Sequence, residues 1–152
     1  MKRVFTKWSS LVAMILLVFS SCKKDNDVPV SPLKQALIAN TWEVYKVIDR
    51  TNELVTVLYE RGAPDNQEDY SLVRQQFRKD GGITYVDQFG MHGTDGSYKL
   101  HEKERKMEIG LASMGLSTLV QNVQVNASTF SYALKADEEN STEFIFSPLR
   151  KH

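Results

Sequence analysis

Short runs of apolar and β-branched residues recur along most of this chain, and turn-forming residues separate them. Between residues 129 and 136 the alternation is regular, because Phe130, Tyr132 and Leu134 would share one face while mostly polar residues take the other. An alternation with period two indicates strands that bury one face. The pattern predicts strands over Trp42–Arg50, Leu54–Tyr59, Tyr70–Arg78, Ile83–Phe89, Gly96–His101, Lys106–Leu111, Thr118–Asn126, Thr129–Ala136 and Thr142–Ser147.

One short helix is predicted in front of these strands, over Ser31–Ala39. The Ser31 hydroxyl can accept hydrogen bonds from the first helical N–H groups, and Pro32 suits the first helical position. Asn40 tolerates the left-handed conformation that often ends a helix. After Asn40 no helical periodicity persists, so the rest of the chain is expected to be strands and turns.

This order of elements predicts an all-β fold, namely an antiparallel up-and-down barrel of about eight strands with a short N-terminal helix. Strands at hairpin spacing form either a closed meander or a sandwich, and there is no strand–helix–strand alternation to suggest a parallel sheet. Closing the sheet leaves no unpaired edge. We expect turns at Asp80–Gly82, Asp95–Gly96 and Asn126–Ser128, and a flexible loop over Gly90–Thr94.

The first 22 residues have a different pattern, which predicts an export signal. Three basic residues and no acidic ones precede an apolar run over residues 11–19, which is too short to span a membrane as a helix. Ser20 and Ser21 then precede Cys22, and this order resembles a bacterial lipobox. The resemblance implies that Cys22 is diacylated, becomes the new N-terminus and anchors the protein in a membrane. The alternatives are an ordinary signal peptide with an incidental cysteine, or an N-terminal membrane anchor.

The segment after Cys22 is polar, contains Pro29 and Pro32, and is typical of a solvated tether. The chain therefore divides into a lipoprotein signal peptide (1–21), a lipidated cysteine with a flexible tether (22–32) and a barrel domain (33–149). The CKKDND start of the tether resembles that of outer-membrane lipoproteins of the Bacteroidetes. The resemblance implies a lipid-anchored protein of the outer membrane, on its periplasmic face or at the cell surface.

The charge balance restricts the possible partners. The 152-residue chain has 19 Lys and Arg against 19 Asp and Glu. Without residues 1–21, 16 basic residues remain against 19 acidic ones, a net charge of −3. This chain lacks the basic surplus that nucleic-acid binding requires, so no nucleic-acid partner is predicted. Cys22 is the only cysteine, and its acylation would leave no thiol for catalysis, redox chemistry or metal binding.

No sequence pattern points to catalysis. The chain has no nucleophile elbow, phosphate-binding loop, dinucleotide-binding glycine pattern or His-Glu-x-x-His motif. His92 and His101 fall in different predicted elements, which argues against a shared metal site. We therefore predict that the protein is not an enzyme and has no catalytic residues, no metal and no cofactor.

Several motifs in order resemble those of the lipocalin-like lipoproteins of the Bacteroidetes. The Trp42 segment resembles a Gly-x-Trp strand opening, with Asn40 in the place of glycine. Residues 77–85 resemble a Phe-x-x-Asp-Gly hairpin, and residues 96–100 resemble a Gly-Thr-Trp-x-Leu strand with Tyr98 in the place of tryptophan. The resemblance spans about residues 33–148. It implies a small antiparallel barrel whose helix closes one end, with Trp42 as the structural plug at that end.

Two classes of function remain open for such a barrel. The interior of a small barrel can hold one ligand, and tyrosines supply both apolar area and a hydroxyl that orients it. We expect a monomeric binding module for a small, partly apolar molecule, with Tyr85, Tyr98 and Tyr132 at the pocket. The alternative is a filled-core module that docks another envelope protein or inhibits an enzyme. An aromatic-lined cavity above about 300 Å³ favours the first function, and a filled interior with an exposed apolar patch favours the second.

Overall fold

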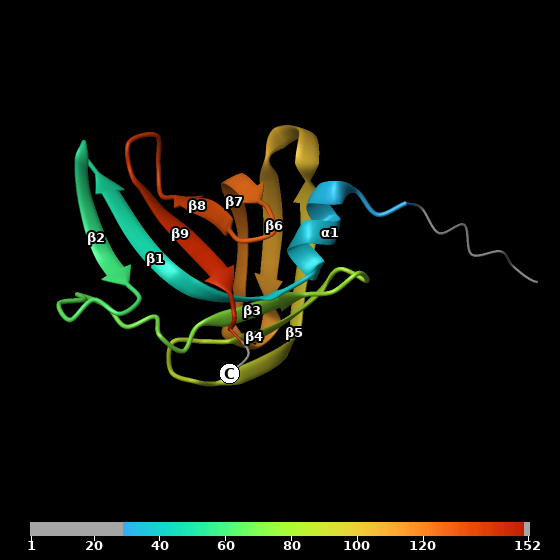
Figure 1. The fold of residues 1–152 in the computed structure, drawn as a ribbon. Helices are drawn as coiled ribbons and strands as arrows, with labels where there is room; N and C mark the ends of the chain where they lie inside the picture. Colours follow the sequence, from blue (N-terminus) through green and yellow to red (C-terminus); the bar gives the residue numbers. More distant parts are fainter. Residues whose placement is uncertain (1–28, 151–152) are drawn as a thin grey trace, which may run out of the picture.

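The short helix predicted after Ser31 is present as α1 (Pro32–Ile38) in the computed structural model (Figure 1). The Ser31 hydroxyl accepts a hydrogen bond from the backbone N–H of Lys34 at 3.1 Å, which satisfies one of the first helical donors. The left-handed end predicted at Asn40 is wrong. Ala39 is right-handed, and its N–H closes the last turn on the carbonyl three residues earlier at 3.4 Å, so the chain enters the first strand without a left-handed residue.

The structure describes residues 29–150. The predicted signal peptide, the lipidation site at Cys22 and most of the predicted tether lie outside the described residues. Within residues 29–150, no helix is long and apolar enough to cross a membrane.

Nine antiparallel strands follow α1, as the alternation predicted, and eight of them close into a barrel (Figure 1). Each strand after β2 pairs with the next along the chain, and β9 returns to β1. Two short 3₁₀ turns, η1 (Glu102–Glu104) and η2 (Ala112–Met114), join β5 to β6 and β6 to β7. The prediction of an all-β, antiparallel barrel is therefore confirmed. The strands are β1 (Thr41–Thr51), β2 (Leu54–Glu60), β3 (Arg74–Phe77), β4 (Gly82–Val86), β5 (His92–His101), β6 (Lys106–Leu111), β7 (Leu116–Val125), β8 (Phe130–Lys135) and β9 (Ser141–Pro148).

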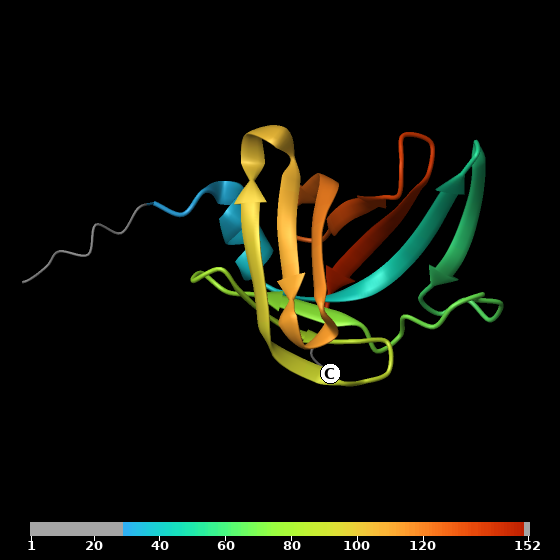
Figure 2. The same ribbon diagram turned by 180° about the vertical axis from the view of Figure 1, so that it is seen from behind.

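The strand outside the closed ring is β2, which pairs only with β1, and β1 therefore has three partners. One edge of β1 pairs with β9 from Trp42 to Arg50. The other edge pairs first with β3, over Thr41–Glu43, and then with β2, over Lys46–Thr51. The β1–β2 hairpin consequently bends away from β4 and β5, as Figure 2 shows from behind. Only the first part of β1 therefore belongs to the closed ring on both of its edges.

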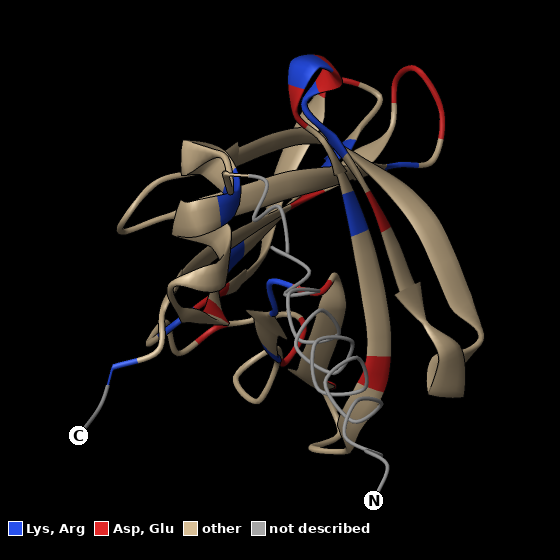
Figure 3. Cartoon of the chain, turned by 90° about the vertical axis from the view of Figure 1, so that its right-hand side faces the viewer, with Lys and Arg blue, Asp and Glu red and all other residues tan. Residues whose placement is uncertain are grey.

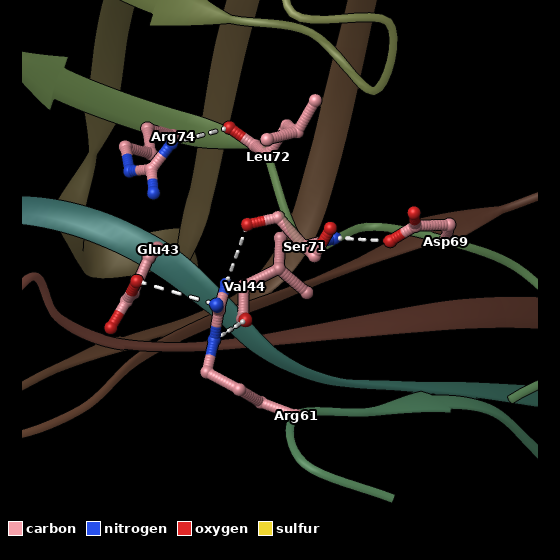
Figure 4. Close-up of polar contacts among 7 residues, drawn as sticks. All are labelled: Glu43, Val44, Arg61, Asp69, Ser71, Leu72 and Arg74. Atoms are coloured by element: carbon pink, nitrogen blue, oxygen red, sulfur yellow. Dashed lines mark hydrogen bonds and ion pairs between the residues drawn. The ribbon is translucent and has the colours of Figure 1, made fainter. Parts of the chain in front are cut away.

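Arg61 holds the chain together at the point where β1 changes partner (Figure 4). Its Nε donates to the carbonyl of Val44 at 2.9 Å, and its Nη2 donates to the carbonyl of Ser71 at 3.2 Å. Its Nη1 also lies 3.6 Å from Oε2 of Glu43, a side chain that is mostly buried. The guanidinium therefore supplies backbone hydrogen bonds and a charge partner where the strand ladder is interrupted.

Two strands are shorter than predicted. β3 begins at Arg74 rather than at Tyr70, because the N–H of Val73 turns back to the carbonyl of Tyr70 at 3.1 Å. β4 ends at Val86, because Asp87 organises a tight loop in place of the last residues of the predicted run. In both cases a local turn competes successfully with the strand pattern.

β5 is longer than predicted, and it corrects two expected turns. The predicted loop over Gly90–Thr94 is wrong from His92 onward, and Asp95–Gly96 lies inside β5 rather than in a turn. The reason is side-chain packing. A Cβ atom at Gly93 would lie 2.1 Å from Cζ of Tyr85, so this glycine leaves room for a ring on β4. Glycine here indicates a close approach between strands rather than a reversal of the chain.

Trp42 connects α1 to the barrel core. Its side chain has no exposed area, and its Nε1 donates to the carbonyl of Leu37 in α1 at 2.8 Å. Its ring packs against Phe130 with 5.6 Å between the centroids. The end of the barrel beneath α1 is thus filled by bulky side chains, and the helix is held to it by a buried hydrogen bond.

We predict that Trp42→Phe lowers the free energy of unfolding by about 1–3 kcal/mol, because the carbonyl of Leu37 would stay buried without its donor. Urea denaturation at an unchanged m-value measures this loss. Tyr45→Phe, at an exposed ring on the same strand, is the matched control and should change stability by less than about 0.5 kcal/mol. Equal stability of wild type and Trp42→Phe would show that α1 is held without this hydrogen bond.

Candidate functional site

A cavity of about 360 Å³ lies inside the barrel, toward the end that carries η2. Its walls come from β3, β4, β6, β7, β8 and β9, from the segment before β3, from the β4–β5 loop and from η2. Aliphatic side chains and one methionine form part of the lining: Val73, Val86, Leu111, Met114, Leu116 and Leu134. Aromatic rings form another part: Tyr70, Tyr85, Phe89, Tyr132, Phe144 and Phe146. This volume lies at the lower end of the range for small-molecule sites.

Strand alternation and register explain why the aromatic rings gather in one wall. Tyr132 on β8 is directly opposite Phe144 on β9, so both side chains leave the sheet on its inner face. Their rings stack with 5.6 Å between centroids, and Tyr70 meets Phe144 edge-on at 5.7 Å. These contacts give the cavity a rigid apolar wall rather than a set of freely rotating rings.

Three residues without apolar side chains also line the cavity, namely Gln75, Asp87 and the exposed Gln88, so Gln75 is its buried amide. Gln75 on β3 is only 9% exposed, and its Nε2 contacts the Tyr132 hydroxyl at 3.4 Å. Its Oε1 is buried and has no hydrogen-bond partner among the described residues. A buried acceptor without a donor costs about 1–3 kcal/mol, so such groups in native proteins call for an explanation.

Gln75 was not among the residues predicted for the site, although the sequence contains a signal for it. The inward positions of the third strand alternate from Val73 to Gln75 to Phe77. A glutamine among apolar inward-facing residues is expected to be a buried polar group, and a buried polar group can indicate a binding site. The strand pattern and the requirement that buried polar groups be paired would together have singled it out.

Burial raises the pKa of the Tyr132 phenol to about 12, although the hydrogen bond from Gln75 acts in the opposite direction. The hydroxyl is therefore protonated at neutral pH and remains a hydrogen-bond donor. No second partner binds this hydroxyl among residues 29–150. Gln75 and Tyr132 form a neutral polar pair inside an apolar cavity.

The mouth of the cavity is organised by Asp87. Its Oδ1 accepts hydrogen bonds from the backbone N–H groups of Phe89 at 2.8 Å and Met91 at 2.9 Å. This tight loop holds Phe89 and Met91 outward, 77% and 63% exposed. Met114 and Leu116, from the β6–β7 turn, are also exposed and line the cavity. Phe89, Met114 and Leu116 therefore form an exposed apolar rim on the cavity.

The three predicted ligand-binding tyrosines lie in different places. Tyr85 and Tyr132 both line the cavity, but the Tyr85 hydroxyl is already engaged by Asp95 Oδ1 at 3.1 Å and by the Ser113 hydroxyl. Tyr98 lies outside the cavity lining, and its hydroxyl donates to the carbonyl of Arg78 at 2.8 Å. Their roles in binding stay predictions.

Tyr98 instead packs with the filled end of the barrel. Its ring meets Phe77 edge-on at 5.1 Å, and Nζ of Lys34 in α1 lies 5.7 Å from the ring centroid. Trp42 is at the same end, beneath α1. Cys22 lies outside the described residues.

Other hollows are lined by a mixture of charged, polar and apolar side chains. One, of about 490 Å³, is bordered by Arg61, Arg74 and Arg150 around Glu43. In it, Arg74 is bound to a backbone carbonyl, as is Arg61 (Figure 4). Figure 3 shows basic and acidic segments interspersed over the chain rather than gathered on one face. Within residues 29–150, no three His, Cys, Asp or Glu side chains come together to hold a metal ion. The interior cavity is therefore the better candidate site.

The raised pKa of Tyr132 predicts a loss of stability at alkaline pH. The folded protein keeps a proton that the unfolded chain releases above pH 10, so the free energy of unfolding should fall as pH rises from 10 to about 12. Tyr132→Phe should flatten this fall by an amount on the order of 2 kcal/mol. Burial also raises the pKa of Tyr59, Tyr70 and Tyr98, which should supply the remainder. Urea denaturation at several pH values measures the free energy of unfolding of the wild type and of Tyr132→Phe. Parallel pH profiles for the two proteins would contradict the prediction.

No protein-family model, curated protein or solved structure matches the chain.

Proposed function

We propose that this protein is a non-catalytic binding module, anchored to a membrane by lipid, that holds a small, partly apolar molecule inside its barrel. The observation that carries the proposal is the cavity of about 360 Å³ with a wall of stacked aromatic rings. Burying apolar ligand surface there is favourable by about 25 cal/mol per Å². The neutral pair of Gln75 and Tyr132 supplies the few polar contacts that give such a site its selectivity.

The alternative, a filled-core module that docks another protein, receives less support. Its core would be packed at both ends, whereas here bulky side chains fill the α1 end and the η2 end is hollow. The exposed apolar rim of Phe89, Met114 and Leu116 is compatible with either function. Because this rim lies at the cavity mouth, we interpret it as the surface that an apolar ligand contacts when it enters the cavity from water.

Anchoring by Cys22 would attach the tether to the end of the barrel opposite the cavity mouth. The Ser31 hydroxyl, at the start of α1, donates to the carboxylate of Glu102 in η1. The cavity mouth is at η2, and β6 runs from η1 to η2. A strand of six residues spans about 20 Å. A tether that enters at α1 would therefore leave the mouth open to the aqueous side.

We predict that Leu134→Trp abolishes ligand binding, because the larger ring would occupy the cavity that Leu134 lines. Native mass spectrometry of the full chain purified from its producing cells should detect a bound small molecule in the wild type and lose it in the variant. Leu119→Trp adds the same ring at an exposed position on β7 and is the matched control. A wild type that carries no bound molecule and melts at the same temperature across a panel of apolar compounds would overturn the binding function.

The lipid anchor has its own test. Cys22→Ala should move the protein from the membrane fraction to the soluble fraction, because the acylated thiol would be lost. Ser21→Ala keeps a small residue before the cysteine and should leave the protein on the membrane. Mass spectrometry of the N-terminal peptide should find two acyl chains on Cys22 in the wild type. Continued membrane association of Cys22→Ala would refute lipidation as the anchor.

A further inference from the structure

The polar pair inside the cavity has unused hydrogen-bonding capacity of both kinds. With Nε2 of Gln75 donating to Tyr132 Oη, the buried Oε1 lacks a donor and the phenolic proton lacks an acceptor among the described residues. If the amide is turned by half a rotation, the phenol donates to Oε1, and Nε2 becomes the group without a partner. In either orientation the pair has one unused donor and one unused acceptor, and both residues line the cavity.

We propose that the ligand is a neutral amphiphile whose hydroxyl group binds between Gln75 and Tyr132, and that the site rejects the ionised carboxylate of the same chain length. This inference rests on the proposed binding function. A hydroxyl both donates and accepts at a single atom, so it satisfies both unused groups at once. A carboxylate only accepts, so it would leave the pair's unused acceptor without a donor, which is Oε1 of Gln75 in one amide orientation and Oη of Tyr132 in the other.

The charges around the cavity point in the same direction. Asp87 is the only charged residue among the described residues that line it, and no Lys, Arg or His is present to pair with an anion. An ionised group that is buried without a partner is strongly unfavourable. Oδ1 of Asp87 is held by two backbone N–H groups at the mouth, and a carboxylate that lines the cavity repels an anion that enters it.

The volume indicates how much of a ligand the cavity can cover, because the cavity is open at its mouth. At about 30 Å³ for each water-sized group, a cavity of about 360 Å³ encloses about twelve non-hydrogen atoms. A ten-carbon chain with a polar head has this size. 1-Decanol and decanoate are therefore matched probes that differ in the head group and not in the chain.

The test is calorimetric titration of the full chain with each probe at neutral pH. We expect 1-decanol to bind at least about tenfold more tightly than decanoate. Gln75→Met removes the amide and keeps a chain of similar length, so it should reduce this preference and raise the melting temperature of the ligand-free protein. Tyr132→Phe, which removes only the hydroxyl, should also reduce the preference. Gln76→Met, at an exposed position of the same strand, is the control and should keep it.

The outcomes separate this inference from the function on which it rests. Equal affinity for the two probes, unchanged by Gln75→Met, would overturn the hydroxyl inference while leaving an apolar binding module. A lower melting temperature of Gln75→Met with an unchanged preference would also overturn it, since that result assigns Gln75 a structural role only. Binding of neither probe, with no bound molecule in the purified protein, would overturn the proposed function as well.

Discussion

The pairing of β9 with β1 is the constraint on which the rest of the structure depends. It closes the sheet and sets Val44 opposite Phe146 and Val47 opposite Phe144, which fixes the aromatic side chains of β9 on the inner face. The same pairing occupies one edge of β1 along almost its whole length, so β3 and β2 must share the other edge. Because a shared edge interrupts the ladder, backbone groups at the junction need other partners, and Arg61 supplies them.

Closure also divides the core into two unequal parts. At the α1 end, Trp42, Phe77 and Phe130 pack against one another and are almost completely buried. At the η2 end, the rings of Tyr132 and Phe144 stack on each other along the wall, and they leave space in front of them. The aromatic side chains therefore fill one end of the barrel and line a cavity at the other end.

The fold could be predicted from the sequence because its signals are local. Strand alternation, the Ser31 and Pro32 helix start and the Asp80–Gly82 turn each depend on residues within a few positions of one another. The site could be predicted only in part, because it depends on register. Tyr85 and Tyr98 have equivalent local patterns, yet pairing between strands places one at the cavity and the other near α1. The prediction that Gly93 lies in a loop was wrong for the same reason. The ring that occupies the space beside this glycine belongs to Tyr85 on another strand, and no local pattern reveals it.

Gln75 shows how a destabilising group can serve selectivity. In the ligand-free barrel its unpaired amide lowers stability, and an apolar residue of the same size would remove that loss. A ligand that satisfies the amide recovers the lost free energy on binding, whereas an analogue that cannot satisfy it leaves the loss in place. Discrimination by an unpaired buried group is therefore much stronger than discrimination by apolar fit, in which one methylene more or less changes little. A barrel that needed only a stable core would have no physical reason to place an amide at this position, and a barrel that selects among molecules of similar length would.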